Sequence, residues 1–157
     1  MSGLIFPQYM EPQLKDDFIR TGFIFDVYDG DTCYYHANLG YDVWAAFQTG
    51  RLMDCWSPEI RPLASRVEGT AARDHLNKLI AKYALNRHTP ADGTPRIGHE
   101  LRIRSVRGNN KWFRHIPRPK KGKYGRWLVA LLGADDNGKV VNINEQMVRD
   151  GFAAEDP

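Results

Sequence analysis

Apolar, β-branched and aromatic residues gather in five short stretches separated by turn residues, which is typical of β-strands. The first three follow one another closely, with Asp29-Gly30 and Gly40 as the turns between them, so they predict a three-strand meander. Thr49-Gly50 is a candidate break in the third. The fourth alternates cleanly between apolar and polar residues, and the fifth follows a long basic segment. The five stretches are residues 21–27, 32–39, 43–54, 99–106 and 127–132.

A helical pattern occupies residues 68–83, between the third and fourth strands. Its apolar residues recur at steps of three and four, which places them on one face of a helix. A second, short helix is predicted through Asp150, with Asn144 as its N-cap and Gly151 as its left-handed stop. The apolar positions of the first helix are Ala72, Leu76, Leu79, Ile80 and Tyr83.

The chain of 157 residues has the size of one domain. Residues 1–20 read as an N-terminal arm and residues 21–157 as the domain. We predict a mainly β protein with helices (α+β). A five-stranded OB-fold barrel, with one main helix across an end and a short C-terminal helix, buries these apolar faces economically. Propensity alone leaves another small α+β fold open.

Composition excludes several classes of protein. No apolar run approaches the roughly 20 residues of a membrane span. Pro7, Glu11 and Pro12 interrupt the N-terminus where a secretory signal needs its apolar stretch, so we expect a cytoplasmic protein. Cys33 and Cys55 suit a reducing compartment, and neither they nor the histidines have zinc-ligand spacing.

Charge is distributed unevenly, although the net charge is only +3. Residues 1–60 hold nine acidic and three basic residues, whereas residues 101–134 hold ten basic residues and no acid. Trp112, Phe113 and Tyr124 interleave with these cations. A block of like charge is often only a solvated face, but cations mixed with aromatic rings favour a polyanion that carries flat bases. We therefore expect DNA or RNA as the partner.

Three short segments hold candidate chemistry. Pro58 cannot donate to a sheet ladder, so the strand before it is expected to end near Ser57 and to leave Glu59 on a loop. Taken singly, the segments have ordinary interpretations: a hairpin turn, a loop acid and one more cation in a basic loop. The segments are Asp29-Gly-Asp-Thr32, Arg51-Leu-Met-Asp-Cys-Trp-Ser-Pro-Glu59 and Lys123-Tyr-Gly-Arg126.

Taken together, these segments resemble the staphylococcal nuclease (thermonuclease) family. That family reads Asp-Gly-Asp-Thr, then Arg-Leu…Pro-Glu with arginine and glutamate eight positions apart, then Lys/Arg-Tyr-Gly-Arg before a strand. Residues 141–153 resemble a later helix of the family, and Gly69 and Ala72 resemble its first helix. The resemblance covers residues 22–153 and implies the barrel already predicted.

The resemblance also implies an activity, the hydrolysis of DNA and RNA phosphodiesters, usually with calcium. Arg51 and Arg126 match the two arginines that hold the scissile phosphate, and Glu59 matches the glutamate that orients or deprotonates the attacking water. These residue types suit the reaction. Arginine's planar fork stabilises charge that grows on phosphate oxygens, and a carboxylate can accept a proton from water.

Metal binding is implied in the same way, with Ca²⁺ as the expected divalent ion. Asp31 matches a metal-binding aspartate, and Ser57 is expected to offer its backbone carbonyl. The family usually has a second aspartate where this chain has Trp56, so calcium should bind more weakly. Asp29 is expected to compensate, with Asp54 as the other candidate.

Nucleic-acid contacts are expected from the basic segment. Lys123 and Tyr124 match residues that contact a nucleotide phosphate in the family, and Arg118, Lys120 and Lys121 extend the run of cations. The sequence ends before the family's third helix and its base-stacking tyrosines. Stacking is therefore expected from Trp112, Phe113 or the N-terminal arm.

Two alternatives stay open. The chain could be an OB-fold module that binds nucleic acid and has lost catalysis; Trp56, in place of a metal-binding aspartate, favours this alternative. It could also be a protein-interaction module on the same barrel. A nuclease without an export signal could be held by a protein inhibitor or be encoded by a phage or mobile element. The sequence decides neither point.

Overall fold

The computed structural model describes residues 19–61, 63–90, 97–105, 107–108, 118–119 and 126–155. Its strands are β1 (Ile19–Asp29), β2 (Thr32–Gly40), β3 (Val43–Leu52), β4 (His99–Ser105), β5 (Arg107–Gly108), β6 (Arg118–Pro119), β7 (Trp127–Ala134) and β8 (Val140–Asn142). Its helical elements are the 3₁₀ turn η2 (Leu63–Ser65) and the α-helices α2 (Arg66–Tyr83) and α3 (Ile143–Arg149).

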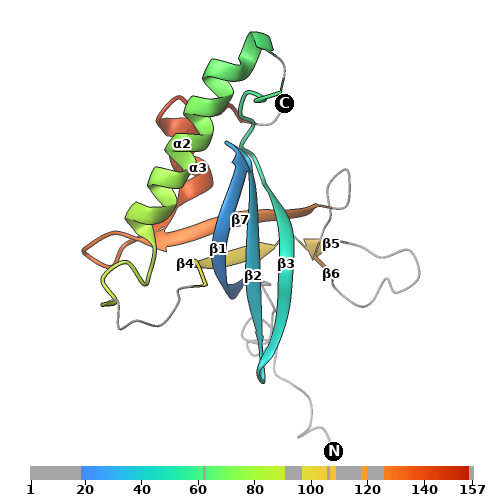
Figure 1. Cartoon of the computed structure of the whole chain (residues 1–157). Helices are drawn as coiled ribbons and strands as arrows, with labels where there is room; N and C mark the ends of the chain where they lie inside the picture. The colour runs from blue at the N-terminus through green and yellow to red at the C-terminus, as the bar shows by residue number, and fades with distance from the viewer. Residues whose placement is uncertain are drawn as a thin grey trace, which may run out of the picture.

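Five of these strands form a closed barrel of the OB type, as predicted. They pair in the order β3-β2-β1-β4-β7, and a parallel pairing of β3 with β7 closes the ring. The strand β8 extends the sheet beyond β7, and β5 pairs with β6 separately. In Figure 1, β1, β2 and β3 lie in front of β4 and β7, and α2 and α3 stand at one end of the strands.

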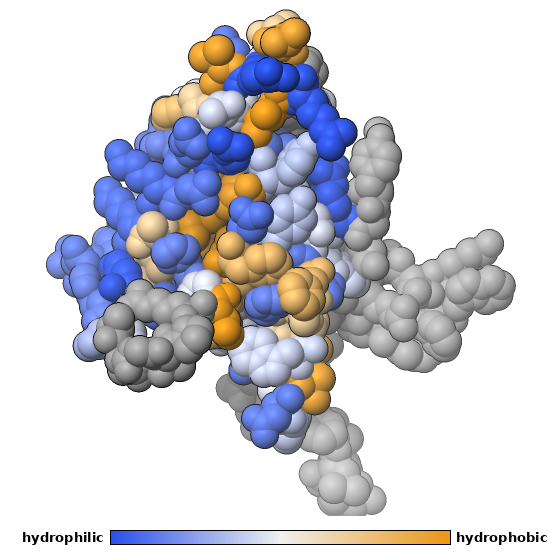
Figure 2. Space-filling model, in the orientation of Figure 1, coloured by the Kyte–Doolittle hydropathy of each residue, from blue (hydrophilic) through white to orange (hydrophobic). Residues whose placement is uncertain are grey.

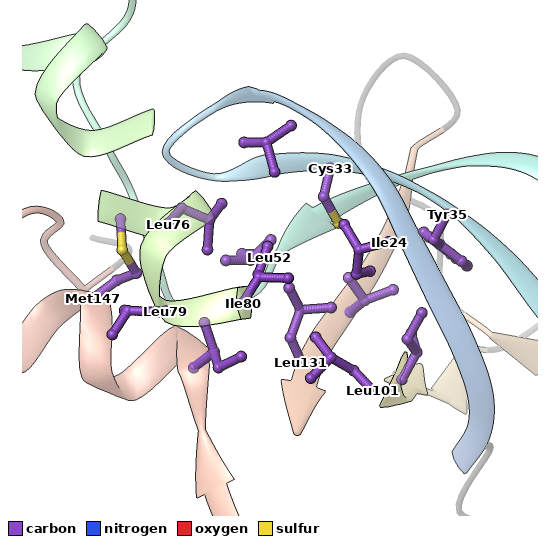
Figure 3. Close-up of a cluster of buried hydrophobic side chains, with 14 of the residues drawn as sticks. Ile24, Cys33, Tyr35, Leu52, Leu76, Leu79, Ile80, Leu101, Leu131 and Met147 are labelled. Carbon is purple, nitrogen blue, oxygen red and sulfur yellow. The ribbon is translucent and has the colours of Figure 1, made fainter. Parts of the chain in front are cut away.

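The hydrophobic core fills the space between the barrel and its two helices. Leu76 and Ile80 of α2 pack with Leu52 of β3 and Leu131 of β7 in one buried cluster (Figure 3). Each of these four side chains is at most 1% exposed, so the face predicted for the helix is the face that it buries. Met147 adds α3 to the same cluster.

Several strand boundaries differ from the prediction: β1 also ends two residues later than predicted, and β7 extends two residues past 132. Ile19 and Arg20 already belong to β1, and the rest of the predicted arm lies outside the described residues. The strand β3 runs unbroken through Thr49-Gly50 but ends at Leu52, not near Ser57. The chain turns at Asp54, whose φ is 52°, and this turn ends the pairing before Pro58 can do so.

The C-terminal helix begins with a different cap from the one predicted. Asn142 is the N-cap, and its side chain accepts a hydrogen bond from the Glu145 backbone N–H. Asn144 lies inside the helix and is buried, because its side chain bonds the backbone of β7 instead: its Oδ1 accepts from Leu131 N–H, and its Nδ2 donates to the Val129 carbonyl. Gly151 has a φ of 84°, which confirms the left-handed stop.

Both cysteines, Cys33 and Cys55, are free and buried. Burial raises the pKa of the Cys33 thiol to about 12, with the charge of Asp29 as a smaller cause. In the part of the chain that the structure describes, no helix has the length and apolarity that crossing a membrane requires.

Candidate active site

The turn between β1 and β2 holds the candidate carboxylates. Asp29 and Asp31 are 8% and 6% exposed. Gly30 between them faces Ser57 and α2 so closely that a Cβ there would lie 2.6 Å from the Ser57 Cβ and 2.7 Å from the Ala72 Cβ. The turn can therefore pack against the helix and the loop after β3 only because this residue is glycine.

Asp31 contacts four other residues through its side chain and its backbone N–H. Its Oδ1 accepts a hydrogen bond of 3.1 Å from the Thr32 hydroxyl. Its Oδ2 accepts one of 3.1 Å from the Ser57 backbone N–H and lies 3.6 Å from Nη1 of Arg51. Its own backbone N–H donates to Oδ1 of Asp29 at 3.1 Å. Asp31 therefore joins the β1–β2 turn to β3 and to the loop that follows it.

Arg51 reaches the turn from β3, where it pairs opposite Thr32. Its Nη1 donates hydrogen bonds of 2.7 Å to the Leu52 carbonyl and 2.8 Å to the Cys55 carbonyl, in addition to its ion pair with Asp31. These contacts brace the turn after β3, and they fix the guanidinium group with only 17% of the side chain exposed.

Arg126 lies directly before β7 and is far from Arg51 in the sequence. The parallel pairing of β3 with β7 joins Gly50 to Trp127 and so carries Arg126 to the same end of the barrel as Arg51. Its Nη1 lies 3.4 Å from the Thr32 hydroxyl oxygen, to which it donates. The two arginines are thus anchored on adjacent residues, Asp31 and Thr32.

Asp29 titrates abnormally in this environment. Burial raises the pKa of its carboxyl from 3.8 to about 6, and the negative charge of Asp31 adds to the increase. Two neighbouring carboxylates repel each other when both are ionised. A cation beside them is therefore electrostatically favoured.

Glu59 is held by its backbone and leaves its side chain exposed. The Ser65 hydroxyl donates to the Glu59 carbonyl at 2.8 Å, and a Cβ on Gly69 of α2 would lie 2.5 Å from that carbonyl oxygen. Within the described residues, the Glu59 carboxylate makes no hydrogen bond or ion pair. The structure therefore joins Asp29, Asp31, Arg51, Ser57 and Arg126 by contacts, and leaves Glu59 two positions beyond Ser57 in solvent.

The oxygen atoms at this site fit a hard cation only in part. The Ser57 hydroxyl oxygen is buried and has no hydrogen-bond partner among the described residues. Because the Ser57 backbone N–H bonds Asp31, this residue offers an oxygen atom for a cation near that carboxylate. Asp29 and Asp31 supply two carboxylates. The described residues contain no cluster of three His, Cys, Asp or Glu side chains that could hold a metal. The site suits an ion that keeps several of its waters.

Trp56 has its side chain 51% exposed. Its backbone pairs with Ala154 through two hydrogen bonds of 2.7 and 2.8 Å. Asp54, the other candidate ligand, lines a cavity of about 740 Å³ together with Arg104 and Arg149. No contact joins it to Asp31 among the described residues, so Asp29 is the better-placed second carboxylate.

The predicted nucleic-acid contacts can be located only in part. Lys120, Lys121, Lys123 and Tyr124 lie outside the described residues, as do Trp112 and Phe113. Arg118 belongs to β6, which pairs with β5. Sequence reasoning missed the role of Thr32, which links Asp31 to Arg126. Its place in the Asp-Gly-Asp-Thr segment was the available signal.

Comparison with models of known protein families finds no match for this chain. Comparison with curated proteins finds no similar sequence either. The barrel and the contacts of the site residues therefore carry the functional argument.

Proposed function

We propose that this chain is a metal-dependent nuclease that hydrolyses phosphodiester bonds of DNA or RNA. One observation carries the proposal. Arg51 and Arg126, which are far apart in sequence, are anchored to Asp31 and Thr32 at one end of an OB barrel. Two fixed guanidinium groups beside a carboxylate turn suit an anionic substrate that must be neutralised before it can be attacked.

The two arginines would hold the phosphate. Nη1 of Arg51 is fixed by two backbone carbonyls and by Asp31, so little reorganisation is needed when charge develops in the transition state. Arg126 approaches the same turn from β7 and donates to Thr32. A guanidinium group can donate two parallel hydrogen bonds to phosphate oxygens.

Glu59 would accept the proton of the attacking water. Its exposed carboxylate stands on a loop whose position is set by the Ser57–Asp31 hydrogen bond and by the contact of its carbonyl with Gly69. A general base needs to reach water. An exposed glutamate on an anchored loop meets this condition.

Asp31 and Asp29, with the Ser57 oxygen atoms beside them, would hold the divalent ion. When bound, such an ion supplies charge neutralisation to the phosphate and polarises water. The residues contribute by holding their oxygen atoms in place: Asp31 is oriented by Thr32 and Ser57, and Asp29 by the Asp31 backbone N–H.

A nuclease assay with and without a chelator tests this proposal. Labelled DNA and RNA oligonucleotides are incubated with the purified chain and either Ca²⁺ or EDTA. Cleavage that requires the metal and disappears in Arg126→Gln supports a nuclease. Cleavage that survives in Arg126→Gln would point to a contaminating enzyme.

A catalytically inactive OB-fold module that binds nucleic acid is the second candidate. It is favoured by Trp56, which removes one carboxylate from the expected metal site, and by the side-chain exposure of that residue. The same assay separates the two proposals, because the inactive module would bind the oligonucleotides and leave them intact with every divalent ion.

A further inference from the structure

The outer face of the β1–β3 sheet carries neighbouring aromatic side chains. Successive residues of a strand point to opposite faces, and Cys33 and Tyr35 of β2 belong to the core. Tyr34 and His36 therefore point outward, and both are half-buried. The strands on either side contribute further rings. The aromatic surface consists of Phe23, Phe25, Tyr34, His36, Trp44 and Phe47.

Phe25 lies at the centre of this aromatic surface. Its ring stacks on His36 with centroids 4.5 Å apart, lies 6.3 Å from Tyr34, and meets Phe47 edge-on at 5.8 Å. Pairing between β1 and β2 shifts register between Ile24 and Asp26, on either side of Phe25. Such bulges redirect a side chain, and here the ring reaches across β2 toward β3.

Much of the aromatic surface is open to solvent. Phe25 is 40% exposed, Trp44 42% and Phe47 77%. Figure 2 shows apolar side chains gathered over the strands that Figure 1 places at the front. Single exposed apolar residues need no explanation, but rings that contact one another on one face, as Phe25, Tyr34, His36 and Phe47 do, indicate a binding surface.

Phe47 is held at this surface by a strained backbone. Its φ is 55°, a left-handed conformation that bulky residues rarely adopt. Its backbone N–H donates a 3.0 Å hydrogen bond to Nδ1 of His36, which maintains the conformation. Because the Phe47 ring stays exposed, the strained backbone conformation is not offset by burial of the ring. Strained positions of this kind cluster at ligand sites.

The aromatic surface leads directly to the candidate active site. Thr32, Tyr34 and His36 share one face of β2, and Arg51 pairs opposite Thr32 on β3. Because two residues span about 7 Å of a strand, Tyr34 lies about 7 Å and His36 about 13 Å along β2 from the residue that anchors Arg126. Stacking rings thus begin within one or two nucleotide lengths of the arginines.

We propose that the aromatic surface stacks the bases of a single-stranded nucleic acid whose backbone is held at Arg51 and Arg126. This inference rests on the proposed function. It adds a binding site for the bases of the substrate, formed by the aromatic surface. Stacking on aromatic side chains beside cations is how proteins bind single strands without reading their sequence. The face of strands 2 and 3 is also where OB barrels commonly bind oligonucleotides.

The decisive variant is Phe47→Gly. It removes the ring and also suits the positive φ, so the barrel should fold at least as well as the parent. The matched control is Tyr41→Gly, since Tyr41 has a φ of 52° and is fully exposed at the β2–β3 hairpin tip, away from the ring contacts. Phe47→Trp restores a ring. All are made in Glu59→Gln and measured with EDTA, so that no cleavage occurs.

Binding is measured by fluorescence anisotropy with a labelled single-stranded 12-mer, with its duplex, and with an abasic 12-mer that has the same backbone. We expect Phe47→Gly to weaken single-strand binding about tenfold or more. Tyr41→Gly should leave it unchanged, Phe47→Trp should restore it, and the abasic strand should bind all proteins equally weakly.

Three outcomes would overturn the inference. They are equal single-strand affinity of parent and Phe47→Gly, an equal loss of affinity for the abasic strand, and self-association in sedimentation that Phe47→Gly abolishes. The last would assign the surface to a second copy of the chain. Failure of the proposed function is distinguishable, because a parent protein that stacks bases but never cleaves with metal keeps this surface and loses the nuclease.

Discussion

The backbone N–H of Ser57 donates a 3.1 Å hydrogen bond to Oδ2 of Asp31, a residue 26 positions earlier in the chain. This bond joins the loop after β3 to the β1–β2 turn. The same Oδ2 lies 3.6 Å from Nη1 of Arg51, which in turn bonds the Cys55 carbonyl. The loop that carries Glu59 is therefore positioned by the same carboxylate that anchors a site arginine.

Glu59→Gln should lower the cleavage rate about a hundredfold or more, as expected when a general base is removed. Affinity for the oligonucleotide should change little, because the Glu59 side chain is exposed and its carbonyl makes the structural contact. Glu68→Gln on α2 is the control and should cleave like the parent. A Glu59→Gln enzyme of parental rate would remove Glu59 from the mechanism.

Arg51→Gln should reduce both stability and activity. It leaves the buried Asp31 carboxylate without its ion-pair partner and leaves the carbonyls of Leu52 and Cys55 without this donor. We expect a loss of about 2–3 kcal/mol in the free energy of unfolding. Adding Asp31→Asn should recover part of the stability and none of the activity. Urea denaturation measures the stability of each variant, and the nuclease assay measures its activity.

That double-mutant comparison has a clear contrary result. If the effects of Arg51→Gln and Asp31→Asn on unfolding simply add, the two side chains are not coupled, and their separation of 3.6 Å has no energetic consequence.

Asp29 should make the metal-free protein less stable as pH rises. Its pKa is raised from 3.8 to about 6 in the folded state, so the folded state binds more protons than the unfolded state between these values. Stability therefore falls from about pH 4 to pH 6 and stays lower above that. Asp29→Asn should stabilise the protein at pH 7.5 by up to about 3 kcal/mol, with no gain at pH 3.5.

Urea denaturation of both proteins in EDTA, at several pH values, measures this difference. Asp26→Asn, which changes an exposed carboxylate of β1, is the control. A stability difference that does not depend on pH would show that Asp29 is not the group that titrates.

Trp56→Asp should tighten calcium binding if this position corresponds to the family's second aspartate. Trp56 is 51% exposed and its pairing with Ala154 uses backbone atoms only. The substitution should therefore cost less stability than replacing a buried tryptophan. Calorimetric titration with calcium measures the affinity of both proteins. Equal affinity in a folded variant would leave Asp29 as the second carboxylate.

The basic segment should contribute to affinity through counterion release. In a Glu59→Gln background, Arg118→Ala, Lys120→Ala and Lys121→Ala together should flatten the slope of log affinity against log salt. The change should be about 0.7 for each lost contact with a single strand. Replacing Arg66, Arg73 and Lys78 of α2 with alanine provides a control of equal charge. An unchanged slope would mean that the segment is only a solvated surface.

The sequence by itself determined the main elements and favoured the barrel that they form. Alternation and turn residues predicted the five barrel strands, and apolar spacing predicted the helix that became α2, because periodicity reports which face of an element is buried. The resemblance carried by three motifs also grouped Asp31, Arg51 and Arg126 as expected site residues. The sequence could not detect β8, a strand of three residues, whose pairing with β7 is decided by the neighbouring strand.

Only the tertiary structure decided which side chains meet. Arg126 reaches Thr32 because β3 and β7 pair in parallel, a contact that spans 94 positions and leaves no local signal. The Asn144 side chain bonds the backbone of β7, because the Leu131 N–H and the Val129 carbonyl need hydrogen-bond partners inside the fold. The aromatic surface depends in the same way on bulges in β1 and β3, because each bulge changes which residues face outward. Strand pairing, which long-range contacts determine, places Tyr34 and His36 on the strand that begins with Thr32, the residue that Arg126 contacts.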